Sequence, residues 1–272
     1  MKLKFITLSL VFLSFQLGIA QLNLASWNIQ HLGKSKSKNN IAYMAEVLRD
    51  FDVIAIQEVV AGDGGAQAVA QLADELNRKG SKWDYKISLP TQSSPYSSER
   101  YAYLWKTSKV KLQGKAFLDQ NYVNEIEREP YVIRFLVENE QITLFNFHAV
   151  PTKKQPEGEV KHFKNYPSLY PNETLVFMGD FNLVDHHTVF NPLKKMGYAL
   201  AFKGEKTSLK MKCDTQKEGD CLSKVYDHFI FPQNKIKILD QGIVRFYKDF
   251  DDIKLARKIS DHLPIWIQLE TN

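Results

Sequence analysis

The sequence predicts an α/β (α+β) protein in which two mixed β-sheets pack face to face and helices cover the outside. Short apolar runs of strand length recur along the whole chain, and some form pairs spaced like hairpins. Between other runs, apolar residues are spaced as on one face of a helix. No linker rich in Pro, Gly or Ser interrupts the pattern, so residues 21–272 are expected to form a single domain.

The elements follow in order from the N-terminal side. Residues 22–28 alternate like a first strand, and residues 53–57 form an apolar run that predicts a buried strand ending at Glu58. Apolar spacing predicts one helix over residues 41–48 and another over residues 66–76, after a flexible glycine-rich segment. Further strands are expected at residues 101–105, 131–137, 142–147, 175–178, 227–231 and 263–269.

The first twenty residues have the pattern of a secretory signal peptide. Lys2 and Lys4 give a positive start, residues 5–17 are mostly apolar, and small residues follow at positions 18 and 20. An N-terminal membrane anchor is the alternative, but the apolar run is shorter than the roughly 20 residues that a spanning helix needs. We therefore expect residues 1–20 to be a signal peptide, and the mature chain to be secreted or periplasmic, with no insertion into a membrane.

The charge balance is mildly basic. The full sequence carries 36 basic and 31 acidic residues, a net charge of +5, and losing Lys2 and Lys4 would lower the net charge to +3. This balance is compatible with a polyanionic substrate such as a nucleic acid but does not single one out. Several lysines cluster in a way more typical of a solvated surface than of a binding site: Lys153, Lys154, Lys161, Lys164, Lys203, Lys206, Lys210 and Lys212.

Cys213 and Cys221 are the only cysteines, and they flank a polar loop. In an exported protein a disulfide across that loop is the leading interpretation, with two free thiols as the alternative. A zinc site is not expected, because two further ligands do not lie nearby at the usual spacing.

Short polar segments lie in or beside the apolar runs, where a buried strand would favour Val, Ile, Leu and Phe. Polar groups placed repeatedly at strand ends usually converge on one site. Carboxylates, amides and two histidines are what metal-assisted cleavage of a phosphodiester requires. In order the segments are Trp27-Asn28-Ile29-Gln30, Gln57-Glu58-Val59, Ser98-Glu99-Arg100-Tyr101, Arg128-Glu129-Pro130, Phe147-His148-Ala149, Gly179-Asp180-Phe181-Asn182, Tyr226-Asp227-His228 and Ser260-Asp261-His262-Leu263-Pro264.

Two of these segments carry most of the chemistry. In the first, Gly179 is expected to let the backbone turn after a strand, Asp180 can orient or deprotonate a water, and Asn182 can bind a phosphate oxygen. A plain Asx turn is the alternative. In the second, His262 can exchange a proton near neutral pH, and Asp261 points elsewhere on a strand, where it suits a metal better. A structural histidine is the alternative for His262 taken alone.

The full set of segments resembles the endonuclease/exonuclease/phosphatase superfamily, and within it the deoxyribonuclease I-like branch. The Glu-Arg-Tyr piece at residues 99–101 and the Arg-Glu-Pro piece at residues 128–130 favour that branch over the phosphatases and sphingomyelinases. The resemblance spans nearly all of the mature chain. It implies a four-layered sandwich of two mixed β-sheets flanked by helices, with the site at one edge of the sheets.

The resemblance also implies residues that hold a cation and the substrate. Glu58 resembles the carboxylate that binds the catalytic divalent cation, Mg²⁺ or Mn²⁺, with Asn28 and Asp261 beside it. A structural Ca²⁺ is left open. Asp180 and Asn182 resemble the residues that hold the attacking water and the scissile phosphate.

Paired acid/base histidines are the second implication. His148 and His262 resemble that pair, with Glu99 expected to orient His148 and Asp227 expected to orient His262. A carboxylate that accepts an imidazole N–H fixes the tautomer and raises the basicity of the ring. Arg128 resembles an arginine that contacts phosphate.

The chain departs from the branch where its members grip DNA. Gln30 and Val60 stand where the branch usually carries arginine, and Ser97 stands where it usually carries a minor-groove tyrosine, with Tyr96 one residue away. Arg100 is present and is expected to contact substrate. Losing two cationic phosphate contacts should weaken duplex binding and its salt dependence.

The sequence therefore predicts a secreted, metal-dependent, sequence-nonspecific endonuclease that acts as a monomer and hydrolyses DNA, expected to be double-stranded, to 5′-phosphate products. The alternative is a phosphodiesterase or phosphatase acting on a lipid or small phosphate ester, such as sphingomyelin or an inositol phosphate, since one fold hosts all of these. A non-catalytic binding module would need a broken catalytic residue, and the sequence retains every catalytic residue that the resemblance implies.

Overall fold

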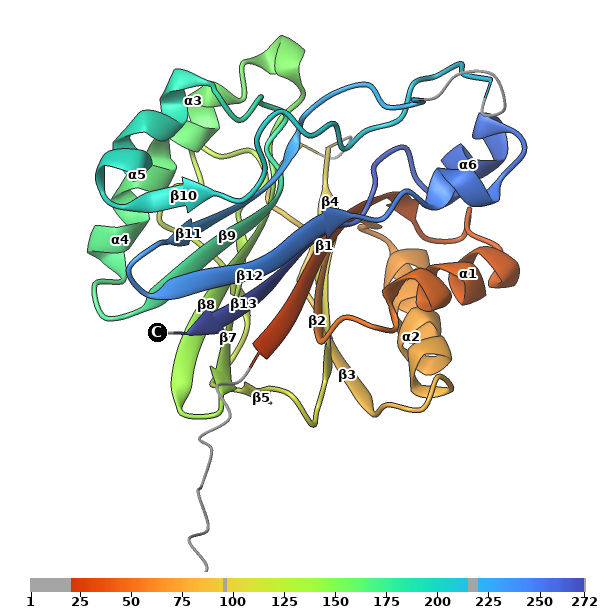
Figure 1. Cartoon of the computed structure of the whole chain (residues 1–272), viewed down its shortest axis with the longest axis horizontal. Coiled ribbons are helices and arrows are strands. Elements are labelled where there is room, and N and C mark those ends of the chain that lie inside the picture. The colour runs from red at the N-terminus through yellow and green to blue at the C-terminus, as the bar shows by residue number, and fades with distance from the viewer. Residues whose placement is uncertain (1–20, 95–96, 215–219, 272) are drawn as a thin grey trace, which may run out of the picture.

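The computed structural model describes residues 21–94, 97–214 and 220–271. The expected signal peptide, residues 1–20, and Tyr96 lie outside the described residues. Two β-sheets lie face to face, and helices cover the outer face of each (Figure 1). The layered sandwich predicted from the sequence is therefore confirmed.

Both sheets are mixed, as predicted. Within the described residues, sheet A has six strands, in the order β12 (Ile236–Ile243), β13 (Ile265–Thr271), β1 (Gln21–Leu32), β2 (Val53–Val60), β4 (Glu99–Lys106) and β3 (Trp83–Ile87). In the same part of the chain, sheet B has seven, in the order β10 (Tyr198–Leu200), β11 (Asp227–Pro232), β9 (Thr174–Asp180), β8 (Glu140–His148), β7 (Tyr131–Val137) and β5 (Lys111–Leu112), with β6 (Phe117–Leu118) also paired to β7. Strands β1 and β2 run parallel, as do β8 and β9, whereas the other pairs are antiparallel.

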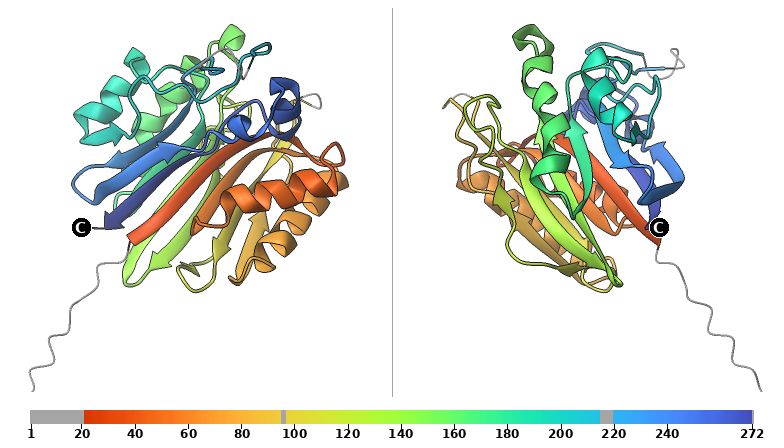
Figure 2. Two further views of the ribbon diagram at one scale, coloured as in Figure 1. Left: turned by 45° about the vertical axis from the view of Figure 1, so that its right-hand side comes forward. Right: turned by 90° about the vertical axis from the view of Figure 1, so that its left-hand side faces the viewer.

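The helices lie on the two outer faces of the sandwich (Figure 2). Sheet A is covered by α1 (Lys38–Leu48), α2 (Asp63–Asn77) and α6 (Ile253–Ile259). Sheet B is covered by α3 (Glu157–Val160), α4 (Tyr166–Leu169) and α5 (Asn191–Lys195). Short 3₁₀ turns lie in the connections: η1 (Thr152–Lys154), η2 (Lys161–Asn165), η3 (Thr188–Phe190) and η4 (Phe246–Asp249).

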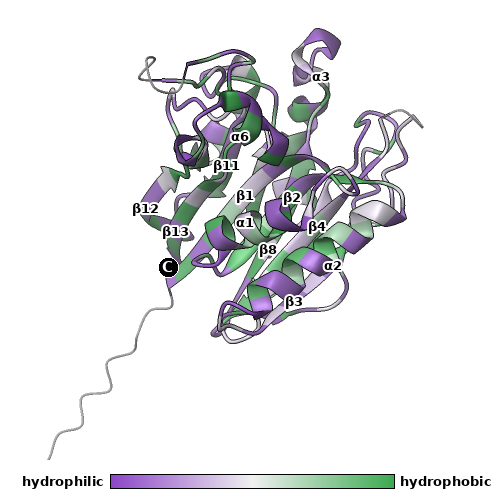
Figure 3. Ribbon diagram, turned by 90° about the vertical axis from the view of Figure 1, so that its right-hand side faces the viewer, coloured by the Kyte–Doolittle hydropathy of each residue, from purple (hydrophilic) through white to green (hydrophobic). Residues whose placement is uncertain are grey.

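Apolar clusters fill the spaces between the four layers. Between the sheets, Leu24 of β1 and Phe135 of β7 belong to one buried cluster. Met44 of α1 lies in a second cluster with the outer face of sheet A, and Tyr166 of α4 lies in a third with the outer face of sheet B. Figure 3 shows hydrophobic stretches on inner strands such as β8 and β11, and hydrophilic residues on the outer helices α1 and α2. Each layer is thus held by apolar burial against its neighbour.

The glycine-rich segment before the second expected helix belongs to the helix itself. Helix α2 begins at Asp63, so Gly64 and Gly65 lie in its first turn rather than in a flexible connection. A Cβ atom on Gly65 would lie 2.0 Å from the carbonyl oxygen of Val60. Glycine therefore lets the helix begin directly against the end of β2.

Two further expectations are tested by the structure. Cys213 and Cys221 form a disulfide, with their Cα atoms 5.6 Å apart, which confirms the leading interpretation. Among the described residues, no helix has both the length and the apolar character needed to cross a membrane. Several elements, most of them short, were not predicted from the sequence: β3, β5, β6, β10, β12 and α3 to α6.

Candidate active site

Strand direction brings the polar segments of sheet A to one edge. Asn28 lies near the C-terminal end of β1 and Glu58 near the same end of the parallel strand β2. Strand β4 runs antiparallel to β2, so its first residue, Glu99, lies at that edge too. His262 precedes β13, which is antiparallel to β1, and it reaches the same edge.

Sheet B presents its polar residues in the same way. His148 ends β8 and Asp180 ends the parallel strand β9, where the two residues are paired in register. Asp227 begins β11, which is antiparallel to β9, and is paired with Asp180. Asn182 follows two residues after β9. The two sheets therefore meet at one edge with opposing rows of polar side chains.

An irregular backbone re-aims the side chains of sheet A. The register between β1 and β2 shifts after Asn28, and the register between β2 and β4 shifts between Ile56 and Val59. At this bulge Glu58 has a φ of 59°, in the left-handed region. Bulges of this kind redirect a side chain at the cost of local strain and concentrate at functional sites.

Gly179 does not form the turn that the sequence analysis expected. It lies inside β9, paired with Phe147 of β8, and has a φ of 136°. A Cβ atom there would lie 1.9 Å from the carbonyl oxygen of Phe147. Glycine is therefore required by the close approach of two strands next to the site. The turn comes later, where Asn182 adopts a φ of 51° and donates its backbone N–H to Asp180 Oδ1 at 2.9 Å.

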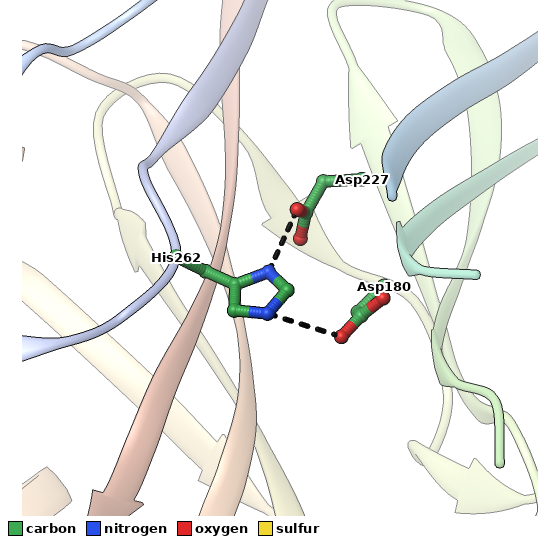
Figure 4. Close-up of side chains that lie close together, drawn as sticks. All are labelled: Asp180, Asp227 and His262. Atoms are coloured by element: carbon green, nitrogen blue, oxygen red, sulfur yellow. Dashed lines mark hydrogen bonds and ion pairs between the residues drawn. The ribbon is translucent and has the colours of Figure 1, made fainter. Parts of the chain in front are cut away.

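His262 and Asp227 form one hydrogen-bonded pair. His262 Nδ1 lies 2.8 Å from Asp227 Oδ2. On the other side of the ring, Nε2 lies 3.6 Å from Asp180 Oδ2 (Figure 4). The imidazole is thus held at Nδ1 and presents Nε2 to the residue that ends β9.

His148 and Glu99 form a second pair with the same geometry. His148 Nδ1 lies 2.9 Å from Glu99 Oε1, and Nε2 lies 3.6 Å from Asp180 Oδ2. The same Nε2 lies 3.9 Å from Glu58 Oε1. Both histidines therefore direct Nε2 toward one carboxylate oxygen of Asp180.

A cleft of about 550 Å³ lies over these side chains. Its lining includes Glu58, Asp180 and Asn182 together with both histidines. Carboxylates that converge with imidazoles in a cleft are the groups that acid/base and metal-assisted hydrolysis uses.

The model of the endonuclease/exonuclease/phosphatase family matches residues 25–262. The chain belongs to this family. It is 27% identical over 276 residues to a deoxyribonuclease of Thioalkalivibrio sp. (strain K90mix), a match that covers 93% of this chain and 72% of the relative. It is 25% identical over 283 residues to deoxyribonuclease gamma of Rattus norvegicus, covering 94% and 86%. A family member from Bacteroides thetaiotaomicron has the same fold, with a TM-score of 0.65, 15% identity, and coverage of 93% of this chain and 99% of that one.

Burial and neighbouring charges give the two histidines opposite protonation states in this family member. Burial, assisted by Arg128, lowers the pKa of His148 to about 4. Burial also acts to lower the pKa of His262, but Asp227 and Asp180 outweigh it and raise that pKa well above its usual value. At neutral pH, His148 is therefore neutral and His262 is protonated.

The carboxyl groups beside the histidines respond to the same burial. Burial raises the pKa of Glu99 to about 7, although the nearby guanidinium of Arg128 acts to lower it. Burial also raises the pKa of Asp180, against the opposing attraction of His262. Above neutral pH an ionised Glu99 accepts the Nδ1–H of His148, which leaves the Nε2 lone pair of His148 facing the cleft.

The residues beside the pairs fit a hard divalent cation. Asn28 Nδ2 lies 3.1 Å from Glu58 Oε1 and 3.1 Å from Asp180 Oδ2, while Asn28 Oδ1 is buried with no hydrogen-bond partner among the described residues. Turning the amide over would aim its oxygen at both carboxylates, and a cation would satisfy all three oxygens. Carboxylate and amide oxygens are the donor set of Mg²⁺ and Mn²⁺.

A second set of side chains in the site, Asp180, Asp227 and His262, also has the spacing of metal ligands. One ligand atom each from Asp180, Asp227 and His262 lies within 4.8 Å of the others (Figure 4). However, Asp227 and His262 already bond each other. The position between Glu58 and Asn28 therefore suits a cation better than this trio does.

Arg128 lines the cleft, whereas the guanidinium of Arg100 is hydrogen-bonded to backbone carbonyl groups of sheet A's connections. Arg128 lines the cleft, donates from Nε to the carbonyl oxygen of His148 at 2.9 Å, and places Nη1 3.9 Å from Glu99 Oε2. Arg100 donates instead to the carbonyl oxygens of Ala61 and Ser88, at 2.7 and 2.8 Å. Its guanidinium thus fastens two connections of sheet A.

One carboxylate oxygen of Asp261 is held by neighbouring side chains, and the other, Oδ1, is buried with no hydrogen-bond partner among the described residues. Its Oδ2 accepts hydrogen bonds from Gln30 at 3.0 Å and from Arg257 at 3.2 Å. Gln30, which stands where the resemblance implied an arginine, thus pairs with Asp261 rather than lying free at the cleft. The other two departures, Val60 and Ser97, do line the cleft.

Sequence reasoning missed two residues of the site. His31 lines the cleft, with Nδ1 3.8 Å from Glu58 Oε2. Thr207 is fully buried and donates its hydroxyl to Asp227 Oδ2 at 2.6 Å. The sequence gives no signal for Thr207, because it lies in an irregular segment twenty residues before its partner.

Proposed function

We propose that this chain is a secreted, Mg²⁺- or Mn²⁺-dependent, sequence-nonspecific endonuclease that hydrolyses DNA to products with 5′-phosphates. The observation that carries the proposal is the pair of histidines whose Nε2 atoms each lie 3.6 Å from Asp180 Oδ2. Each ring is hydrogen-bonded at Nδ1 to its own carboxylate, His148 to Glu99 and His262 to Asp227. Relatives named deoxyribonucleases support DNA as the phosphodiester.

The opposite protonation states of the histidines suggest their tasks. His148, neutral with Nε2 toward the cleft, accepts a proton from the attacking water as the new P–O bond forms. His262, protonated, donates its Nε2 proton to the 3′-oxygen as the P–O3′ bond breaks. One proton is taken up and one is released, which leaves a 5′-phosphate and a 3′-hydroxyl.

The remaining residues orient the reacting groups. A bound Mg²⁺ or Mn²⁺ supplies Lewis-acid polarisation of the phosphate. Glu58 and Asn28 would hold that ion, with Asp261 beside them; Asp261 Oδ2 is bonded to Gln30 and Arg257, whereas its Oδ1 has no hydrogen-bond partner among the described residues. Asp180 and Asn182 bind the water and the scissile phosphate.

Cationic side chains contribute little to the lining of the cleft. Arg128 lines the cleft, but Val60 and Ser97 line it as well, at positions where the resemblance implied gripping residues. The presence of Val60 and Ser97 in the lining favours the alternative function, a phosphodiesterase or phosphatase acting on a lipid or a small phosphate ester. The catalytic residues favour that alternative less. The proposed enzyme binds double-stranded DNA as a monomer.

Supercoiled plasmid tests the proposal. The mature chain should nick and then linearise plasmid with Mg²⁺ or Mn²⁺, with and without added Ca²⁺, and EDTA should abolish cleavage. His262→Ala should do the same, whereas His186→Ala, which removes a histidine that is 81% exposed, should not. Intact plasmid together with release of phosphate or phosphocholine from small esters or sphingomyelin would support the alternative instead.

Export is a separate part of the proposal. The pattern of residues 1–20 and the disulfide between Cys213 and Cys221 both favour a secreted or periplasmic chain. Expression with residues 1–20 should give a processed protein outside the cytoplasm that begins at Gln21. Retention of the full-length chain in the cell would contradict this part alone.

A further inference from the structure

A strap crosses the edge of the sandwich beside the His262–Asp227 pair. We define the strap as residues 207–210 and 221–224, which pair with each other between β10 and β11. Thr207 donates its backbone N–H to Lys224 at 2.7 Å, and Ser223 donates to Ser208 at 2.7 Å. The disulfide between Cys213 and Cys221 closes the strap beyond these hydrogen bonds.

The opposite side of the strap is bonded to the segment that carries His262. Ser208 and His262 form an isolated β-bridge. Leu209 donates its backbone N–H to Asp261 at 2.7 Å, and Leu263 donates to the carbonyl oxygen of Thr207 at 2.7 Å. The backbone on both sides of His262 is therefore fixed to the strap.

The side chain of Thr207 is bonded to the partner of His262. Its hydroxyl donates to Asp227 Oδ2 at 2.6 Å, and its Oγ1 accepts the backbone N–H groups of Asp227 at 3.1 Å and Tyr226 at 3.2 Å. The whole residue is 0% exposed. Water therefore cannot replace these hydrogen bonds without a change in the local structure.

Thr207 thus joins Asp227, through its hydroxyl, to Leu263, the residue that follows His262, through its carbonyl oxygen. His262 leads into β13 of sheet A, whereas Asp227 begins β11 of sheet B. Asp227 Oδ1 is buried with no hydrogen-bond partner among the described residues, so Oδ2 receives both the Thr207 hydroxyl and His262 Nδ1. The rotation of the carboxylate about its Cβ–Cγ bond is then set by Thr207 together with His262.

We propose that Thr207 is a positioning residue that holds the Asp227 carboxylate, and the backbone that follows His262, in the geometry of the catalytic pair. The functional part rests on the proposed diester hydrolysis, and the structural part does not. Removing the hydroxyl frees the carboxylate to rotate, which weakens the hydrogen bond to His262 Nδ1. The ring then loses its fixed orientation while the cleft keeps its lining.

The test compares Thr207→Val, which keeps the shape of the side chain, with Thr207→Ser, which keeps the hydroxyl. Thr143→Val is the matched control, because Thr143 is also fully buried and donates its hydroxyl to a carboxylate, that of Glu173. Thr143 lies on β8 five residues before His148. The first readout is the low-field proton NMR signal of His262 Nδ1–H, assigned by its loss in His262→Ala. The second is kcat and KM for plasmid DNA.

We expect Thr207→Val to lose the Nδ1–H signal to exchange with water and to lower kcat by about 10–100-fold with little change in KM. Thr207→Ser should retain the signal and most of kcat, and Thr143→Val should retain both. Persistence of the signal in Thr207→Val, or an equal loss in Thr143→Val, would overturn the proposal. If Thr207→Val does not fold, Thr207→Ala replaces it under the same criteria. Since the signal needs no substrate, it decides the role of Thr207 even if the parent chain leaves DNA intact.

Discussion

Glu99 and His148 are hydrogen-bonded at 2.9 Å although they belong to different sheets of the sandwich. Glu99 begins β4 of sheet A, and His148 ends β8 of sheet B. The pair formed by Asp227 and His262 likewise joins a residue of sheet B to the segment that leads into β13 of sheet A. The catalytic geometry therefore depends on the packing between the sheets, so that a change in that packing alters both pairs together.

A buried polar contact beneath the site reinforces this dependence. Gln57 of β2 donates to Asn146 Oδ1 of β8 at 2.6 Å, and both residues are fully buried. Gln57 precedes Glu58, and Asn146 lies two residues before His148. This hydrogen bond sets the relative position of two site residues across the sandwich.

The pH dependence of cleavage should be bell-shaped. His148 must be neutral to accept a proton, and burial lowers its pKa to about 4, so it becomes competent as the pH rises. His262 must be protonated to donate, and its pKa is raised well above its usual value, so activity falls only on the alkaline side of neutrality. The acidic limb belongs to the coupled His148–Glu99 pair and lies between about 4 and about 7.

Glu99→Gln separates the two limbs. It should shift the acidic limb and leave the alkaline limb in place, as measured by kcat/KM against pH. Asp227→Asn should instead move the alkaline limb to lower pH, because the raised pKa of His262 depends on the Asp227 carboxylate. A shift of the same limb in both variants would contradict the assignment of separate tasks.

Glu58→Gln should weaken cation binding. Glu58 belongs to the bulge of β2, and its Oε1 lies 3.1 Å from Asn28 Nδ2. We expect the Kd for Mn²⁺, measured by calorimetry or electron paramagnetic resonance without substrate, to rise by about 10–100-fold or more. Glu46→Gln, on the exposed side of α1, is the control and should bind Mn²⁺ like the parent chain. Unchanged binding in Glu58→Gln would place the cation elsewhere.

Gly179→Ala should destabilise the fold. The new Cβ would lie 1.9 Å from the Phe147 carbonyl oxygen at a φ of 136°, so the strands must separate. We expect a loss of about 2–4 kcal/mol in the free energy of unfolding, measured with denaturant. Gly158→Ala is the matched control, because its Cβ would have no neighbour within 4 Å. Equal stability of the two variants would show that β8 and β9 can move apart without penalty.

The long central elements could be predicted from the sequence because burial on both faces gives them a continuous apolar run. The strand expected at residues 131–137 is observed as β7 (Tyr131–Val137) with the same bounds. The edge strands β3, β10 and β12 are partly exposed and short or mixed in composition, so no apolar run marks them. The short helices on sheet B are 4 or 5 residues long, too short for a helical period to be recognised.

The site shows the same division. Asp180, His148 and His262 stood out because each polar residue interrupts or adjoins an apolar run, and the family resemblance implied their roles; the structure brings all three together. The partner of Asp261 could not be foreseen, because its hydrogen bond with Gln30 depends on the bulge in β1. Thr207 could not be foreseen either, because a long-range hydrogen bond from an irregular segment leaves no local pattern.

The most direct test of the account is the nicking rate of supercoiled plasmid by His148→Ala, His262→Ala and the double variant. Each single change should lower the rate by about 10²–10⁴-fold, and the double variant should be little worse than the slower single one, because the two rings serve the same bond exchange. His186→Ala should keep the parent rate. A parent rate in either single variant, or equal losses in all three single variants, would contradict the claim that the two pairs around Asp180 carry the reaction.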